Sequence, residues 1–263
     1  MLNRPFINVL LLLMLCAPAA AQAQNLENTF FITEHLPPYT ASVNGEAQGL
    51  SVDILRATLR AAGINPRNIK IHVYPWARGF KMTLKTPNTC LFATVRNKER
   101  EHLFKWAGPI GDVNFALISL KDNIEMNSFA DIQKYSVGVI RSGVSHQTLL
   151  QKAPEGTRIE LSTDITAMIK KLQKGRIDLI LENEHVLHHV IKKSNLDWDK
   201  FKINYVLNFG RMYFAFSNST EDYVVRRMQK GIDTIRRNGK LKEIQQKFLP
   251  KARATSLEVT PLN

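Results

Sequence analysis

Short apolar segments alternate along this chain with segments in which apolar residues recur every three or four positions. The first kind is typical of buried strands and the second of amphipathic helices. The clearest helical period places Ile165, Met168, Ile169 and Leu172 on one face, and Gly175 ends it. Strands are predicted over 30–33, 69–74, 91–95, 113–120, 135–140, 159–161, 177–181 and 212–217.

Helical periods separate these strands in two similar units, one before and one after residue 128. Strands joined through helices pair in parallel, so the pattern predicts an α/β fold with helices on the sheet faces. Ser162 or Thr163 is expected to cap the helix that follows them. Two helices over 225–235 and 241–248 complete the fold, and residues 251–263 show no pattern.

Ligands of open α/β sheets bind beyond the carboxyl ends of strands and between domains. The turns that follow the predicted strands are therefore the candidate site segments. They are residues 34–39, 75–78, 94–100, 141–145 and 182–184.

Residues 1–23 have the composition of a secretory signal peptide. Arg4 precedes an apolar run over 6–18 that is too short to span a bilayer, and the small residues of 19–23 provide a cleavage site. We expect this segment to be removed and the product to be periplasmic. No later segment approaches the roughly 20 apolar residues of a membrane helix, so a soluble product is expected.

The formal net charge is +13, from 36 Lys and Arg against 23 Asp and Glu. Nucleic-acid binding is nevertheless disfavoured, because the cations are scattered and do not alternate with aromatic residues. The charge instead favours anionic ligands or acidic surfaces. Cys90 is the single cysteine beyond the signal segment, so no internal disulfide is expected; its apolar strand predicts a buried thiol.

The apolar strand that contains Cys90 leads into a polar turn with two arginines, Arg96 and Arg100. A guanidinium held where a strand ends can bind a carboxylate through two parallel hydrogen bonds. The alternative is a solvated charged run, in which these arginines pair with Glu99 and Glu101.

Several short motifs in the chain resemble those of the family-3 periplasmic solute-binding proteins, the amino-acid-binding components of ABC importers. The resemblance spans the whole sequence after the signal segment. The motifs are Pro37-Pro38-Tyr39, Gly49-Leu50-Ser51-Val52-Asp53-Ile54, Asn97-Lys98-Glu99-Arg100 with Phe104, Gly108 and Pro109, Gly138-Val139, Gly175-Arg176-Ile177-Asp178 and Asn238-Gly239-Lys240-Leu241.

The resemblance implies a two-lobe Venus-flytrap, the periplasmic-binding-protein fold, in which each lobe is a mixed, mostly parallel sheet flanked by helices. Lobe 1 would comprise 25–112 and 212–263, and lobe 2 would comprise 116–207. The hinge would lie near 113–116 and 208–211.

The resemblance also implies roles for individual residues. Arg100 would hold a ligand α-carboxylate, helped by the helix start at Gly143 to Ser145. Trp76 would pack on the ligand side chain, although it could equally be a core residue below Pro75. Asn183 falls at or beside the acidic position that takes an α-ammonium.

This chain departs from the family pattern around the expected site. Asn97 and Val95 stand where residues with hydroxyl groups are usual. Asn183 is neutral, so the partner of an ammonium would have to be Glu34, Glu182 or Glu184. An amino acid remains the expected ligand.

The candidate ligand-binding residues are Glu34, Tyr39, Trp76, Arg78, Thr94, Arg100, Arg141, Ser145, Glu182 and Asn183. Arg78 and Arg141 leave room for a second anionic group on the ligand. His185 and His189 are one helical turn apart, but no third ligand is evident, so neither a metal nor a cofactor is expected.

We expect a monomeric binding protein that delivers its ligand to a membrane ABC permease. Two alternatives remain open at this point. A soluble sensory module would have the same site. A periplasmic enzyme of this fold, similar to cyclohexadienyl dehydratase, would need a general acid or base, for which Glu34, Glu182 or His35 could serve.

Overall fold

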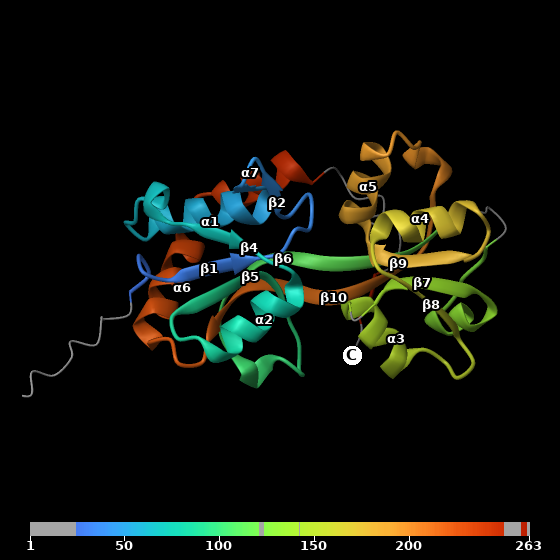
Figure 1. The fold of residues 1–263 in the computed structure, drawn as a ribbon, viewed down its shortest axis with the longest axis horizontal. Coiled ribbons are helices and arrows are strands. Elements are labelled where there is room, and N and C mark those ends of the chain that lie inside the picture. Colours follow the sequence, from blue (N-terminus) through green and yellow to red (C-terminus); the bar gives the residue numbers. More distant parts are fainter. Residues whose placement is uncertain (1–24, 121–123, 142, 250–258, 262–263) are drawn as a thin grey trace, which may run out of the picture.

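A computed structural model describes residues 25–120, 124–141, 143–249 and 259–261. The chain forms two α/β lobes that are joined by two long strands, β6 (Phe104–Ser119) and β10 (Lys202–Ser217) (Figure 1). These strands pair antiparallel along most of their length, from Lys202 opposite Ser119 to Ser217 opposite Phe104. The predicted signal peptide lies outside the described residues.

Lobe 1 is built on strands that run in the order β4-β1-β5-β10-β6. Strand β1 pairs in parallel with both β4 and β5, whereas β5 pairs antiparallel with β10. Helices α1 and α7 lie on one side of this sheet and α2 on the other (Figure 1). The elements are β1 (Phe30–Thr33), β4 (Ile71–Val73), β5 (Thr89–Arg96), α1 (Leu50–Ala61), α2 (Trp76–Lys85), α6 (Asp222–Arg237) and α7 (Lys240–Phe248).

Lobe 2 continues the same sheet in the order β6-β9-β7-β8. Strand β7 pairs in parallel with β8 and β9, and β9 pairs antiparallel with β6. Helices α4 and α5 lie above the sheet and α3 below it in Figure 1. The elements are β7 (Ser136–Ile140), β8 (Arg158–Ser162), β9 (Leu179–Asn183), α3 (Val144–Lys152), α4 (Ile165–Gln173) and α5 (Glu184–Lys193).

Three short strands complete the described structure. Strands β2 (Ala41–Val43) and β3 (Glu46–Gln48) form a hairpin after β1. Strand β11 (Val259–Pro261) pairs in parallel with residues 206–208 of β10, where the two lobes meet. The patternless end of the sequence therefore contains a strand that its composition did not predict. The 3-10 segments are Pro66–Asn68, Glu101–Leu103, Phe129–Lys134 and Trp198–Lys200.

Helix α4 shows how the apolar pattern becomes packing. Met168, Ile169 and Leu172 are buried as the periodicity predicts. The cap differs from the prediction: the side chain of Asp164 accepts the Ala167 N–H at 2.8 Å, one or two residues after the serine and threonine that the sequence suggested. A carboxylate at this position also complements the positive end of the helix.

The described residues form two hydrophobic clusters, one that extends across both lobes and one confined to lobe 2. Phe92 and Phe214 pack with ring centroids 5.9 Å apart in the lobe 1 core. Cys90 is fully buried and unpaired, as predicted. None of the helices in the described ranges is both long and apolar enough to cross a membrane.

The predicted hinge segments lie within β6 and β10. The register between these strands shifts between Asn208 and Arg211, where Gly210 has a positive φ of 101°. The Asn208 amide donates to Asn114 Oδ1 at 3.0 Å, which links the two strands at this point. The lobe boundaries and the hinge motion stay predictions.

Candidate functional site

Arg100 lies just beyond the end of β5, on the lobe 1 side of the junction. The turn that places it is closed by Asn97, whose side-chain oxygen accepts the Arg100 N–H at 3.1 Å. The guanidinium carbon lies 5.2 Å from the ring centroid of Trp76 and 5.6 Å from that of Phe80. Its Nη1 donates to the Val95 carbonyl at 3.4 Å. Two aromatic rings and a backbone carbonyl thus hold the cation in place.

No described carboxylate lies within ion-pair distance of the Arg100 guanidinium. Burial lowers the pKa of Arg100, and the nearby charges of Glu99 and Glu34 oppose this effect. Arg96, four residues earlier, differs because it binds both oxygens of Glu101, at 2.5 and 2.7 Å. The charged run therefore contains one arginine that is paired and one that is available to an anion.

Two acidic side chains approach this region from different lobes. Glu34 follows β1 in lobe 1, and Glu182 is in β9 of lobe 2, where it is 7 % exposed. Burial raises the pKa of Glu34 to about 7, against the effect of Arg100. Burial also raises the pKa of Glu182 to about 7; the Asn183 N–H opposes this and the charge of Glu34 adds to it. Near neutral pH both carboxyl groups can gain or lose a proton.

A hydrogen bond joins the two lobes beside these carboxyl groups. The Tyr39 hydroxyl donates to Asn183 Oδ1 at 3.3 Å, and both residues are buried. Burial raises the pKa of Tyr39, which keeps this donor protonated. The same bond can form only when the lobes are close together.

The Tyr39 loop is itself held against the start of α1. The Pro38 and Tyr39 carbonyls accept the N–H groups of Leu50 and Ser51, at 3.1 and 2.9 Å. These bonds satisfy two of the N–H groups that a helix start leaves unpaired. Gly49 makes this approach possible, because a Cβ atom there would lie 2.7 Å from the Tyr39 carbonyl oxygen.

Asn183 has a structural task that the sequence did not reveal. It precedes α5, and its Oδ1 accepts the N–H groups of His185 and Val186 at 3.0 and 3.2 Å. Its Nδ2 donates to the Asn114 carbonyl in β6 at 3.2 Å. The amide therefore caps a helix and contacts both lobes. Glu34, Glu182 and Glu184 stay the predicted partners of a ligand ammonium group.

Thr94 and Ser145 are both buried. The Thr94 hydroxyl donates to the Leu91 carbonyl at 3.1 Å, across Ala93, which has a positive φ of 59°. Ser145 is the second residue of α3 and lies in the first turn of that helix. Their contacts with a ligand stay predictions.

Arg78 and Arg141 are exposed. The Arg78 guanidinium carbon lies 4.1 Å from the centroid of the Tyr74 ring. The Arg141 backbone N–H donates to the Ser162 carbonyl, at the edge of the lobe 2 sheet. The structure thus gives each arginine a place at the surface, and their roles toward a second anionic group stay predictions.

Phe80 is the site residue that the sequence analysis missed. It follows Trp76 by four positions on α2, so both rings lie on one face of the helix, with centroids 5.7 Å apart. This spacing was visible in the sequence. What it did not show is that Arg100 would lie against that face.

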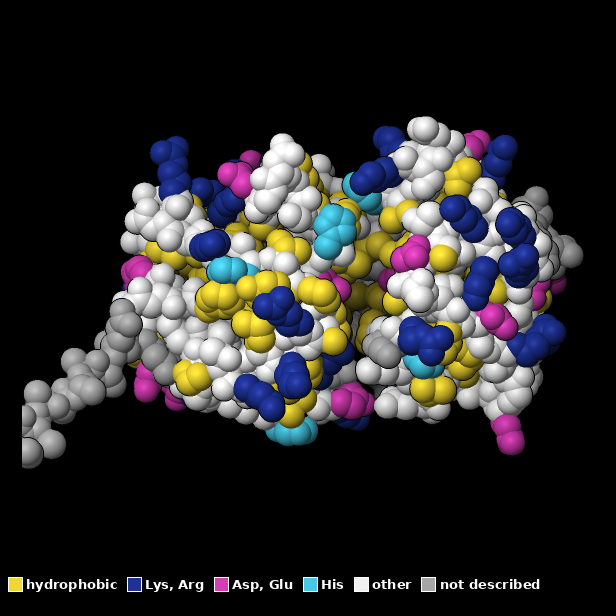
Figure 2. Space-filling model, viewed as in Figure 1, with side chains coloured by type: hydrophobic (Ala, Val, Ile, Leu, Met, Phe, Trp, Pro, Cys, Tyr) yellow, Lys and Arg dark blue, Asp and Glu magenta, His cyan; other side chains and the backbone are white. Residues whose placement is uncertain are grey.

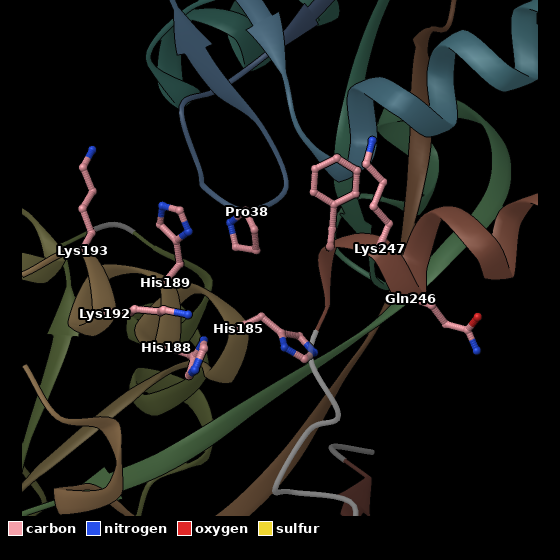
Figure 3. Close-up of a pocket in the computed structure, with 9 residues that line it drawn as sticks. Pro38, His185, His188, His189, Lys192, Lys193, Gln246 and Lys247 are labelled. Carbon is pink, nitrogen blue, oxygen red and sulfur yellow. The ribbon is translucent and has the colours of Figure 1, made fainter. Parts of the chain in front are cut away.

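Figure 2 shows a hollow between the two lobes, with hydrophobic side chains in its walls and lysines and arginines spread over both lobes. A distinct pocket of about 490 Å³ lies between α5 and α7 (Figure 3). It does not include Arg100, Glu34 or Glu182 among its lining residues. Over the described ranges no group of three His, Cys, Asp or Glu residues could hold a metal ion.

Solved structures of known proteins share this fold. A histidine kinase sensor domain with similarity to periplasmic binding proteins is 18% identical, with a TM-score of 0.72, covering 86% of this chain and 97% of that one. An ancestral arginine-binding protein bound to arginine is 17% identical, with a TM-score of 0.69, covering 84% and 98%. The arginine-, lysine-, histidine-binding protein ArtJ from Geobacillus stearothermophilus is 15% identical, with a TM-score of 0.67, covering 87% and 99%.

The structural similarity to these proteins establishes the two-lobe periplasmic-binding-protein fold. At such low sequence identity it does not identify a ligand. No curated protein sequence shows significant similarity to the chain. Residues 29–251 match the bacterial extracellular solute-binding proteins, family 3, and this range covers most of the sequence. The motifs quoted above lie within it. The chain therefore belongs to the family-3 bacterial extracellular solute-binding proteins.

Proposed function

We propose that this protein binds a small carboxylate-bearing ligand, an α-amino acid, between its two lobes and delivers it to an ABC permease. One observation carries the proposal. Arg100 is a half-buried guanidinium that lies against two aromatic rings and has no described carboxylate partner. A buried charge without a partner is costly, so an anion bound there is stabilised strongly.

The aromatic rings next to Arg100 suit the body of such a ligand. Trp76 and Phe80 present apolar faces beside the guanidinium. A carboxylate held by Arg100 would leave the rest of the ligand over these rings, where dispersion and exclusion of water add to the affinity.

An ammonium group on the ligand would bind near the carboxyl groups of Glu34 and Glu182. A cation placed between them favours the ionised carboxylates, so ligand binding would release protons near neutral pH. Two acidic groups and one arginine also suit a ligand with more positive than negative charge. The three residues come from both lobes, so the complete set of charges requires the lobes to be together.

Lobe closure follows from the same geometry. Lobe 1 supplies Arg100, Trp76 and Glu34, and lobe 2 adds Glu182 and the helix start at Ser145. A ligand that contacts both lobes binds the closed state more tightly than the open one and shifts the population toward it. The bond between Tyr39 and Asn183 further stabilises this state.

The place of action follows from the family and from the signal-like segment. The family is described as extracellular, and residues 1–23 are proposed to direct export to the periplasm. The closed protein would present both lobes to the permease, and no bond of the ligand would be broken.

The direct test compares two arginines that differ in their partners. Ligands are first found by native mass spectrometry of protein purified from its export compartment, and by thermal-shift screening of amino acids, small peptides and dicarboxylates. Calorimetric titration is then repeated with Arg100→Met and with Arg96→Met as the matched control. Arg100→Met should weaken binding by about 100-fold or more. Equal affinities of the wild-type and Arg100→Met proteins would remove Arg100 from the site and with it the proposal.

A sensory role is the second candidate, because a histidine kinase sensor domain is among the similar structures. It would use the same binding site. The transport role and the sensory role are distinguished by measuring uptake of the identified ligand in cells with and without the protein. Restored uptake on adding back the gene supports transport, and uptake that never depended on the protein supports a sensor.

Catalysis is a third candidate, since carboxyl groups with a pKa of about 7 are suited to general acid and base chemistry. Incubation of the purified protein with the ligand distinguishes this from binding. Turnover that is abolished by Glu34→Gln or Glu182→Gln would identify an enzyme.

A further inference from the structure

The pocket between α5 and α7 is separate from the Arg100 site. It has a volume of about 490 Å³, in the range of small-molecule sites. Figure 3 shows the side chains of α5 on one side, with Pro38 and Lys247 across from them. Helix α5 belongs to lobe 2, whereas Pro38 and α7 belong to lobe 1. The pocket therefore spans the junction of the lobes.

The polar lining of this pocket is strongly basic. Histidines and lysines dominate it, and no Asp or Glu is among the lining residues. Among the described residues, no carboxylate lies within ion-pair distance of Lys192 or Lys193, while Lys247 binds Asp53 at 3.0 Å. The basic lining residues are His185, His188, His189, Lys192, Lys193 and Lys247.

The pKa values of His185 and His189 are lowered in these basic surroundings. Burial lowers the pKa of His185, and the neighbouring His188 lowers it further. Burial also lowers the pKa of His189, with further contributions from Lys193 and from His35 of lobe 1. Burial and neighbouring basic groups thus both oppose the protonation of His185 and His189. A bound anion would remove this opposition.

Lysines in the last turn of a helix do not by themselves indicate a ligand. They complement the negative end of the helix, and α4 carries Lys170 and Lys171 in the same way. The α5 lysines differ because they line a pocket whose opposite wall comes from the other lobe. An anion there would contact the cations of α5 and face Pro38 and α7 of lobe 1, where Lys247 is bound to Asp53.

We propose that this pocket is a second binding site, for a small multivalent oxyanion such as a phosphate-bearing compound. The histidine and lysine side chains would donate hydrogen bonds to its oxygens, and Phe248 and Pro38 would provide apolar walls. The proposal is independent of the ligand at Arg100. Since the pocket is assembled from both lobes, an anion in it would also favour the closed arrangement.

The test is calorimetric titration of the full-length exported protein with inorganic pyrophosphate, at constant ionic strength. Lys192→Gln combined with Lys193→Gln should weaken binding by about fivefold or more. The control combines Lys170→Gln in the last turn of α4 with Lys174→Gln just after that helix. It removes the same charge away from the pocket and should bind as the wild type does. Co-sedimentation with phosphatidylglycerol vesicles is measured in parallel.

Saturable binding with one pyrophosphate per chain, weakened in the α5 variant only, supports the site. Equal binding by both variants would overturn it, because the attraction would then come from the overall charge. Absence of pyrophosphate binding would overturn it too. Binding to vesicles without binding to pyrophosphate would mean that the basic surface recognises membranes and that the pocket holds no small anion.

Discussion

Replacing Glu182 by Gln is expected to stabilise the protein at alkaline pH. Glu182 is 7 % exposed, and its Oε1 accepts the Asn183 N–H at 2.7 Å. Glutamine retains a side-chain oxygen that can accept the same bond and has nearly the same volume. The substitution therefore removes the charge and little else.

The magnitude follows from the pKa of Glu182, which rises from 4.5 to about 7 on folding, chiefly because of burial. Below about pH 4.5 the carboxyl group is protonated in both the folded and the unfolded state, so its ionisation does not affect the free energy of unfolding. Between 4.5 and 7 only the unfolded chain loses the proton, so the folded state of the wild type is increasingly disfavoured. Above pH 7 this cost reaches about 3 kcal/mol.

The assay is urea unfolding of the wild type and of Glu182→Gln between pH 4.5 and 8. The variant should gain about 2–3 kcal/mol over the wild type at pH 8 and nothing at pH 4.5. Glu155→Gln, which removes an exposed carboxylate of the same lobe, controls for the change in net charge. A stability difference between Glu182→Gln and wild type that does not change with pH would refute the reasoning.

Two further predictions concern the contacts that hold the site loops. Asn183→Ala should lower the free energy of unfolding by about 1–2 kcal/mol, because the N–H groups of His185 and Val186 lose their cap. Asn183→Asp should keep the cap and most of the stability. Equal losses of stability in the two variants would contradict the capping role. Gly49→Ala should lower the free energy of unfolding by about 1–3 kcal/mol, since the φ of Gly49 is 121° and a Cβ there would clash with a backbone oxygen. Thermal melting should show a larger loss of stability for Gly49→Ala than for Gly45→Ala, because a Cβ at Gly45 meets no atom within 4 Å.

The residues near Arg100 show where sequence reasoning succeeds. Its place at the end of an apolar strand could be predicted, because strand and turn signals are local. Its contact with Phe80 could not, although the four-residue spacing of Trp76 and Phe80 was visible. That contact depends on how α2 packs beside β5, which involves residues about 20 positions apart.

Asn183 and strand β11 are features that could not be predicted from the sequence. The sequence predicts that Asn183 is a neutral substitute for an acidic ligand contact. In the structure its side-chain oxygen caps α5 and accepts a hydrogen bond from Tyr39, 144 residues away. Strand β11 has no apolar period of its own and is fixed by pairing with β10. Neither feature is encoded in a local pattern.

The sequence by itself determined the α/β class, the buried faces of the helices, the buried thiol of Cys90 and the family. These depend on periodicity and short motifs, which reflect interactions between near neighbours in the chain. Only the tertiary structure decided that Arg100 lacks a described carboxylate partner, that Glu34 and Glu182 share one acidic region, and that α5 and α7 enclose a basic pocket. Such properties depend on distances between distant segments, and burial then sets the energies of their charges.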